Sequence, residues 1–211
     1  MISSVLQKMI FCATGKESVS ELSDQEIAAV KEVWMRARQM DVGSNILSEL
    51  IDKKPSFAVY YGFERSQPTE ELRKSQAFIL QAKRIQDFLE TAVSSLGLSP
   101  DSIIHNHSYR IGQIHYYKGV NFGADNWLVF KKVTIEQVNA LQKKSSLFGS
   151  ASFKDLKAAE QRLDYPPNGN QRRCQAIVGW NKLMSMIIRE MKRGFLEEAR
   201  RNCGDDTDEF R

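Results

Sequence analysis

The spacing of proline constrains this chain more than any other feature. Its 211 residues contain only five prolines, at positions 55, 68, 100, 166 and 167, and long proline-free stretches lie between them. Because proline disrupts a helix interior, this spacing suits a chain of long helices. Apolar residues recur at intervals of three and four in these stretches, and no alternating strand pattern stands out. We therefore predict an all-α fold of about seven to eight helices.

The first predicted helix opens with a capping box, in which the Ser23 hydroxyl and the Glu26 carboxylate cap backbone amides. Its apolar stripe includes Trp34. Further helices are expected at 41–54, where Pro55 ends the helix, and at about 70–96, 126–141 and 177–195. Another begins at Ser99-Pro100-Asp101, with serine as the cap and proline at the first helical position, and runs to Gly119. Its apolar face is expected to hold Ile104, Ile111 and Ile114.

The chain divides into one domain with a tail at each end. Residues 1–22 show little periodicity and form an N-terminal extension, residues 23–201 form the domain, and residues 202–211 form an acidic C-terminal tail. The stretch 145–168 is a long connection that has room for a helical turn near 154–163.

Charge and cysteine content exclude several classes of protein. The net charge is +4, and lysines and arginines alternate with acidic residues, so we expect no nucleic-acid partner. No apolar run is long enough for a membrane span and no basic leader precedes the first apolar residues, so a cytoplasmic location is expected. The three cysteines have no CxxC spacing and are interpreted as free thiols, and a lipid or disulfide partner for Cys12 is not expected.

The common enzyme motifs are absent from the sequence. The chain contains only three histidines, so any metal site or imidazole base must use one of them. His105 and His107 stand two residues apart and point to different faces of a helix, which disfavours a metal pair. His115 lies near Ile111 and Ile114, where it is either a partly buried structural histidine or a ligand. A single imidazole cannot hold a bare zinc ion, but it can hold haem iron, because the porphyrin supplies four ligands.

A series of motifs along the chain resembles the globin family. The series runs through the capping box, Trp34, Pro55 with its aromatic cluster, Ile111-Gly112-x-x-His115, Lys118-Gly119-Val120 and Trp127. Its order and spacing are similar to those of globins over about residues 23–200, particularly the cytoglobin-like and nematode globins with extended tails. The resemblance implies a globin-like fold around a pocket for haem b, iron protoporphyrin IX.

The same resemblance assigns roles to individual residues. It implies that His115 is the proximal iron ligand and that Ile111 packs under the porphyrin. On the distal side, Gln81 takes the position where many globins carry a histidine. Ile85 then lies over the iron, and Leu47 caps the distal pocket.

Further residues are assigned to the pocket by the same comparison. Arg84 is expected to reach a haem propionate, and Val120 and Trp127 to contact the cofactor. Either Tyr61 or Phe63 stacks on the haem, depending on how the corner after Pro55 is counted, and the sequence leaves both open.

Three functions follow from the resemblance. The first is reversible binding of oxygen, with carbon monoxide or nitric oxide as further ligands, for transport, storage or sensing. The second is a redox globin that passes electrons to oxygen, nitrite or nitric oxide with a reductase partner, and the third is a haemless globin-fold interaction module. An oxygen-binding role is favoured over an enzyme, with dioxygenase or reductase side activity left open. Because an amide is a poor iron ligand, Gln81 predicts a five-coordinate ferrous haem.

Overall fold

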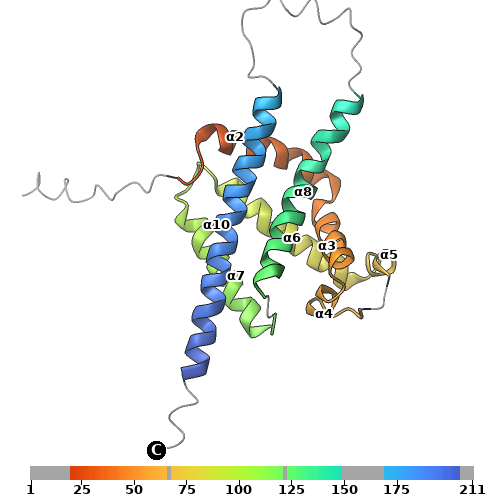
Figure 1. The fold of residues 1–211 in the computed structure, drawn as a ribbon, viewed down its shortest axis with the longest axis vertical. Helices are drawn as coiled ribbons and strands as arrows, with labels where there is room; N and C mark the ends of the chain where they lie inside the picture. Colours follow the sequence, from red (N-terminus) through yellow and green to blue (C-terminus); the bar gives the residue numbers. More distant parts are fainter. Residues whose placement is uncertain (1–19, 66–67, 121–122, 149–168, 205–211) are drawn as a thin grey trace, which may run out of the picture.

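The computed structural model describes residues 20–65, 68–120, 123–148 and 169–204 (Figure 1). Within these ranges it contains eight α-helices, one 3-10 helix and no strand, which confirms the predicted all-α class. The elements are α2 (Asp24–Ala37), η2 (Arg38–Met40), α3 (Val42–Lys53), α4 (Phe57–Tyr60), α5 (Thr69–Leu72), α6 (Gln76–Ser95), α7 (Ser102–Tyr117), α8 (Ala124–Phe148) and α10 (Gly169–Gly204). Cys12, the expected turn near 154–163 and the acidic residues 205–211 lie outside the described residues.

The capping box at the start of α2 is confirmed. Ser23 Oγ accepts a hydrogen bond from Glu26 N at 3.3 Å, and Ser23 N donates to Glu26 Oε2 at 2.8 Å. These bonds satisfy amides that lack partners within the helix. The helix then buries its predicted stripe, with Trp34 2% exposed.

The start of α7 differs from the prediction. The helix begins at Ser102, and Asp101 precedes it without a side-chain cap. The Asp101 carboxylate instead accepts hydrogen bonds from Ser20 Oγ at 3.1 Å and from Glu21 N at 2.9 Å. These hydrogen bonds hold the segment before α2 against the start of α7, where Leu22 is buried.

The stretch expected as one helix from about residue 70 is divided in two. Ser75 Oγ donates to Leu72 O at 2.8 Å, which closes α5, and accepts from Phe78 N at 3.1 Å, which opens α6. One serine therefore ends one helix and caps the next, because its hydroxyl competes with the backbone for hydrogen bonds. The helices α8 and α10 in turn extend beyond their predicted bounds.

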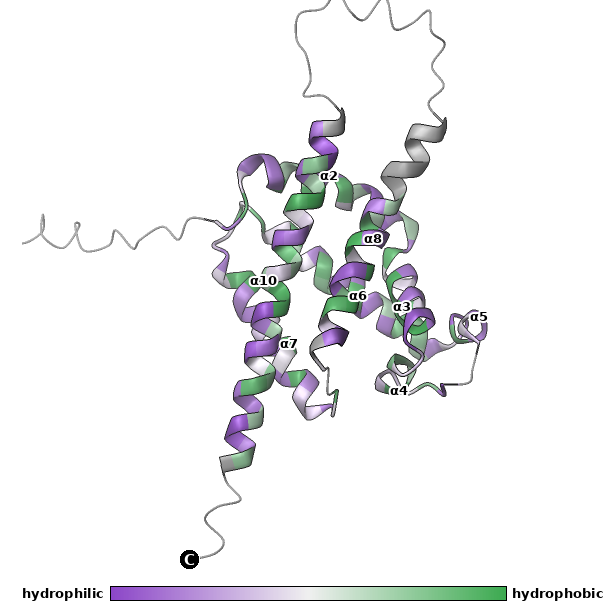
Figure 2. Ribbon diagram, viewed as in Figure 1, coloured by the Kyte–Doolittle hydropathy of each residue, from purple (hydrophilic) through white to green (hydrophobic). Residues whose placement is uncertain are grey.

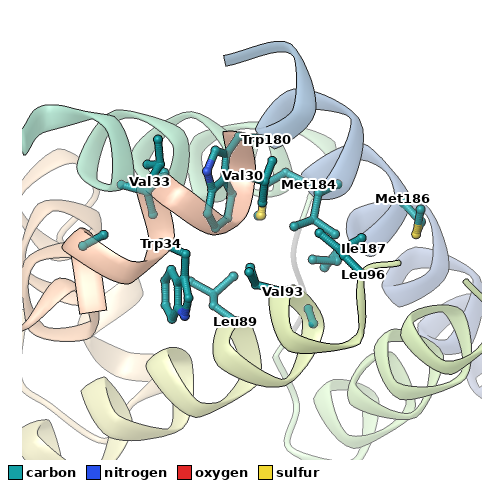
Figure 3. Close-up of a cluster of buried hydrophobic side chains, with 14 of the residues drawn as sticks. Val30, Val33, Trp34, Leu89, Val93, Leu96, Trp180, Met184, Met186 and Ile187 are labelled. Atoms are coloured by element: carbon teal, nitrogen blue, oxygen red, sulfur yellow. The ribbon is translucent and has the colours of Figure 1, made fainter. Parts of the chain in front are cut away.

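The main core forms where α10 packs against α2, α7 and α8, while α3 packs against α6 and α8. The rings of Trp34 and Trp180 lie 5.9 Å apart at its centre, surrounded by apolar side chains of α2, α6 and α10 (Figure 3). Hydrophobic and hydrophilic residues alternate along α10 (Figure 2), as expected for a helix with one buried face. None of the helices in the described ranges combines the length and apolar character needed to cross a membrane.

A smaller apolar cluster lies beside the main core, between α3 and α6. Its buried residues are Leu47, Ile51, Ala58, Phe63, Leu72, Phe78 and Ala82. Two half-buried residues, Tyr61 and Ile85, pack against both clusters. Tyr61 and Ile85 therefore lie at the junction between the two clusters, and the resemblance to globins assigns both of them to the haem pocket.

Candidate functional site

The ring of His115 is held by the backbone of its own helix. His115 Nδ1 lies 2.7 Å from the carbonyl oxygen of Ile111, one turn earlier in α7. Because a carbonyl can only accept, this bond places the proton on Nδ1, and the neutral ring carries its lone pair on Nε2. The indole of Trp127, from α8, lies 6.2 Å from the imidazole between ring centroids. The ring therefore has a defined tautomer and a packed neighbour.

Burial favours the neutral form of this histidine. Desolvation lowers the pKa of His115 below its ordinary 6.5, and the hydrogen bond to Ile111 opposes part of that shift. A neutral imidazole with its Nδ1 proton bound to a carbonyl is the state that coordinates a metal through Nε2. The local chemistry of His115 thus suits an iron ligand.

Two close backbone contacts fix α7 against α10. A Cβ added to Gly112 would lie 2.0 Å from Met191 O, and one added to Gly194 would lie 2.1 Å from Tyr109 O. The buried side of α7 is therefore set by small residues facing α10, and Ile104 is buried there. Ile114 is 51% exposed, so its expected place on the buried face is wrong, because it points away from this contact.

The turn after α7 ties the next pocket candidate to His115. Val120 N donates to the carbonyl oxygen of His115 at 2.9 Å, and Gly119 supplies the left-handed φ of 64° that the turn requires. Val120 and Trp127 are both buried. The structure thus brings Ile111, His115, Val120 and Trp127 together.

The opposite wall comes from α6, which crosses α3 at a glycine. Gly43 fits so closely that an added Cβ would lie 2.2 Å from Ala82 O. Gln81, next to this crossing, is half-buried, and so is Ile85 one turn later. The Phe88 ring, further along the helix, lies 5.2 Å from the His107 ring of α7, between ring centroids. The two helices that carry Gln81 and His115 therefore meet directly.

The two aromatic candidates after Pro55 occupy different surroundings. Phe63 is buried and its ring lies 6.2 Å from that of Phe78, within the smaller cluster that also holds the fully buried Leu47. Tyr61 instead contacts both clusters together with Ile85. Desolvation raises the pKa of the Tyr61 hydroxyl to about 12, so the phenol stays neutral. Of the two rings, only that of Tyr61 packs, as Ile85 does, against both clusters.

Other sequence candidates do not join this group. Arg84 is exposed. His105 Nε2 lies 3.6 Å from Glu21 Oε1, whereas His107 packs on Phe88, so these histidines face different neighbours as predicted. Within the part of the chain that the structure describes, no three His, Cys, Asp or Glu residues cluster to hold a metal ion. One imidazole is what this site offers.

Comparison with solved structures gives the fold a precedent. The globin-like protein Glb-12 from C. elegans matches with a TM-score of 0.60 and 18% sequence identity, covering 86% of this chain and 92% of that one. The chain has a globin-like fold. No family model matches the sequence, and no curated protein matches it either. The chain therefore resembles globins in its three-dimensional fold, whereas its sequence identity to them is low.

The residues present fit a haem. The half-buried apolar side chains Ile85, Phe88 and Ile111 belong to α6 and α7, which would face either side of a flat apolar group. His115 has the proton on Nδ1 that leaves Nε2 to coordinate. A porphyrin needs one protein imidazole, which matches the donor set of this site.

Sequence reasoning overlooked the contacts that position the wall residues. Gly43, Gly112 and Gly194 set the two helix crossings, and glycines inside helical patterns were the available signal. The sequence contained only a weak indication of the contact between His107 and Phe88, namely that His107 lies two helical turns before His115.

Proposed function

We propose that this chain is a haem-binding globin that binds oxygen or another diatomic gas reversibly at a His115-ligated iron. The hydrogen bond between His115 Nδ1 and Ile111 O carries this proposal, because it sets the tautomer and ring orientation that an axial ligand requires. His115 belongs to α7, which contacts α6 through the rings of His107 and Phe88.

The bound haem would supply an iron with one open coordination site for the gas. His115 would hold the iron from α7, with Ile111 against the porphyrin. From α6, Ile85 would exclude water from the distal side. The Gln81 amide would donate a hydrogen bond to a polar bound ligand.

Tyr61 is our candidate for the ring that stacks on the cofactor. Phe63 packs on Phe78 in the smaller cluster, whereas Tyr61, like Ile85, packs against both clusters. Leu47, buried in the smaller cluster, would cap the distal pocket from α3, and Arg84 has the exposure that suits a contact with a propionate at the pocket edge.

Absorbance spectra of the ferric, ferrous and carbon monoxide forms test this function. The wild type should show a Soret band that shifts on reduction and on binding carbon monoxide. The variant His115→Ala should lose or scramble iron ligation and retain its helix content by circular dichroism, while His105→Ala, whose ring faces Glu21, is the matched control and should ligate normally. Unchanged ligation in His115→Ala would defeat the assignment, and a protein without a Soret band after haem addition would indicate a haemless interaction module.

A further inference from the structure

The segment just before α2, Ser20–Leu22, is held on the domain by hydrogen bonds, and we call it the strap. Glu21 N donates to Asp101 Oδ2 at 2.9 Å, and Ser20 Oγ donates to both oxygens of the same carboxylate at 3.1 Å. Leu22, the last residue of the strap, is buried. The last three residues of the predicted N-terminal extension are therefore docked at the start of α7.

A second anchor joins the strap to α10. Arg189 donates to Glu21 Oε1 at 2.6 Å and to Glu21 Oε2 at 3.4 Å, so the guanidinium holds both oxygens of the carboxylate. This contact holds the pKa of Glu21 below its ordinary 4.5, and the carboxylate is ionised at neutral pH. His105 Nε2, from α7, lies 3.6 Å from Glu21 Oε1. One carboxylate of the strap thus faces α7 and α10 at once.

The closed strap leaves polar groups of α7 without good partners. His105 Nε2 is buried and has no hydrogen-bond partner in the part of the chain that the structure describes. The Asp101 carboxylate caps no amide of α7 and is bonded to the strap instead. Detachment of the strap exposes the His105 nitrogen to water and frees Asp101 for the helix amides. Because these gains offset part of the strap's own hydrogen bonds, the strap should open at far lower free energy than the domain unfolds.

The groups that hold the strap belong to two helices that are locked together. Asp101 immediately precedes α7, His105 lies in the first turn of α7, and Arg189 lies in α10. The two close glycine contacts between α7 and α10 prevent either helix from shifting alone. Because α7 also carries His115, a restraint on that residue extends to the groups that hold the strap.

We propose that the Ser20–Leu22 strap opens and closes as a unit and is coupled to the haem site, so that haem bound through His115 favours the closed strap. The coupling rests on the proposed function, whereas the opening of the strap does not. With its imidazole on iron, His115 restrains α7 and keeps the strap's acceptors in place, so closing the strap loses less conformational freedom. Coupling is reciprocal, so breaking the strap should weaken haem retention. The device links the N-terminal extension to the occupancy of the site.

Hydrogen exchange of the full chain without haem tests the strap by itself. The amides of Glu21 and Leu22 should exchange by local opening, much faster than buried amides of α10. Glu21→Gln removes the ion pair with Arg189 and should speed this exchange by about tenfold or more, as expected from losing a hydrogen bond between charged groups. Glu32→Gln is the matched control, because Glu32 forms an exposed ion pair with Arg36 at 3.3 Å, and it should leave the strap unchanged. Equal strap exchange in Glu21→Gln and the wild type would overturn the proposal.

The same measurement on the haem-loaded protein tests the coupling. Ferric haem should slow exchange of the strap by about fivefold or more, the lower end of common coupling strengths, and His115→Ala should remove this slowing. Haem should also pass to excess apomyoglobin faster from Glu21→Gln than from the wild type, with Glu32→Gln again as the control. Circular dichroism checks that each variant folds.

The possible failures can be told apart. A haem-loaded protein whose strap exchanges as fast as that of the haem-free chain refutes the coupling alone. A chain that takes up no haem refutes the proposed function and the coupling with it, whereas the local opening of the strap is decided by Glu21→Gln in either case.

Discussion

Gly43 of α3 and Ala82 of α6 meet backbone to backbone, so closely that a Cβ on Gly43 would lie 2.2 Å from the Ala82 carbonyl oxygen. This contact fixes the point along each helix at which α6 crosses α3. Gln81 is the residue immediately before it, so the same contact positions the candidate distal side chain.

The first prediction concerns this crossing. Gly43→Ala should lower the free energy of unfolding by about 1–3 kcal/mol, because a rigid carbonyl must move to admit the methyl group. Gly123→Ala is the matched control, since a Cβ there meets no atom within 4 Å. Urea unfolding of both variants measures the difference, and equal stability of Gly43→Ala and the wild type would mean that the helices do not meet this closely.

The second prediction concerns the serine between α5 and α6. Ser75→Ala removes both the cap on Phe78 N and the bond to Leu72 O, and should cost about 1 kcal/mol of stability. Ser102→Ala, at the first position of α7, should change stability far less, because no side-chain cap forms at that helix start. Thermal unfolding compares the two, and a neutral Ser75→Ala would show that the hydroxyl is dispensable.

The third prediction concerns His115 and pH in the haem-free protein. Burial lowers the folded-state pKa of His115 below the ordinary 6.5, so the unfolded chain binds the proton more tightly than the folded one. The stabilisation linked to neutral His115 is full above pH 6.5 and is lost as the pH falls from there through the lower folded-state pKa. In His115→Gln this part of the pH dependence should vanish, as measured by urea unfolding across that range. Parallel wild-type and variant curves would contradict it.

The fourth prediction concerns Gln81. The ferrous, ligand-free protein should be five-coordinate, and Gln81→His should produce a six-coordinate, low-spin spectrum. Gln81→Leu should speed oxygen dissociation by about fivefold, as expected from losing a hydrogen bond of about 1 kcal/mol. Lys83→Ala, an exposed residue of the same helix, should leave the rate unchanged. A six-coordinate spectrum in the wild type would refute the open site.

Local signals predicted the fold well where one stretch of chain decides the outcome. The capping box at Ser23 and Glu26 and the stop at Pro55 needed no distant partner, and both match the structure. The start of α7 could not be found in this way, because Ser20 and Glu21 bind Asp101 from about 80 residues away in sequence.

In the candidate site, too, features set within one helix could be predicted from the sequence, whereas features set by contacts between helices could not. Ile111 and His115 belong to one helix and lie one turn apart, so their spacing could be read from the sequence, whereas the hydrogen bond between them was not predicted. The exposure of Ile114 and the separate neighbours of Tyr61 and Phe63 depend on which face of each helix meets α10 or α6. Such contacts depend on glycines and small residues in partner helices, which periodicity of a single helix does not reveal.

The paired glycine contacts at Gly112 and Gly194 have a mechanical consequence. Backbone pressed against backbone at two points leaves α7 no room to slide or roll on α10, because packed interiors transmit displacement instead of absorbing it. A displacement of His115 caused by a ligand at the proposed site would therefore move α7 and α10 together. Because α10 is 36 residues long, that displacement would reach positions far from His115.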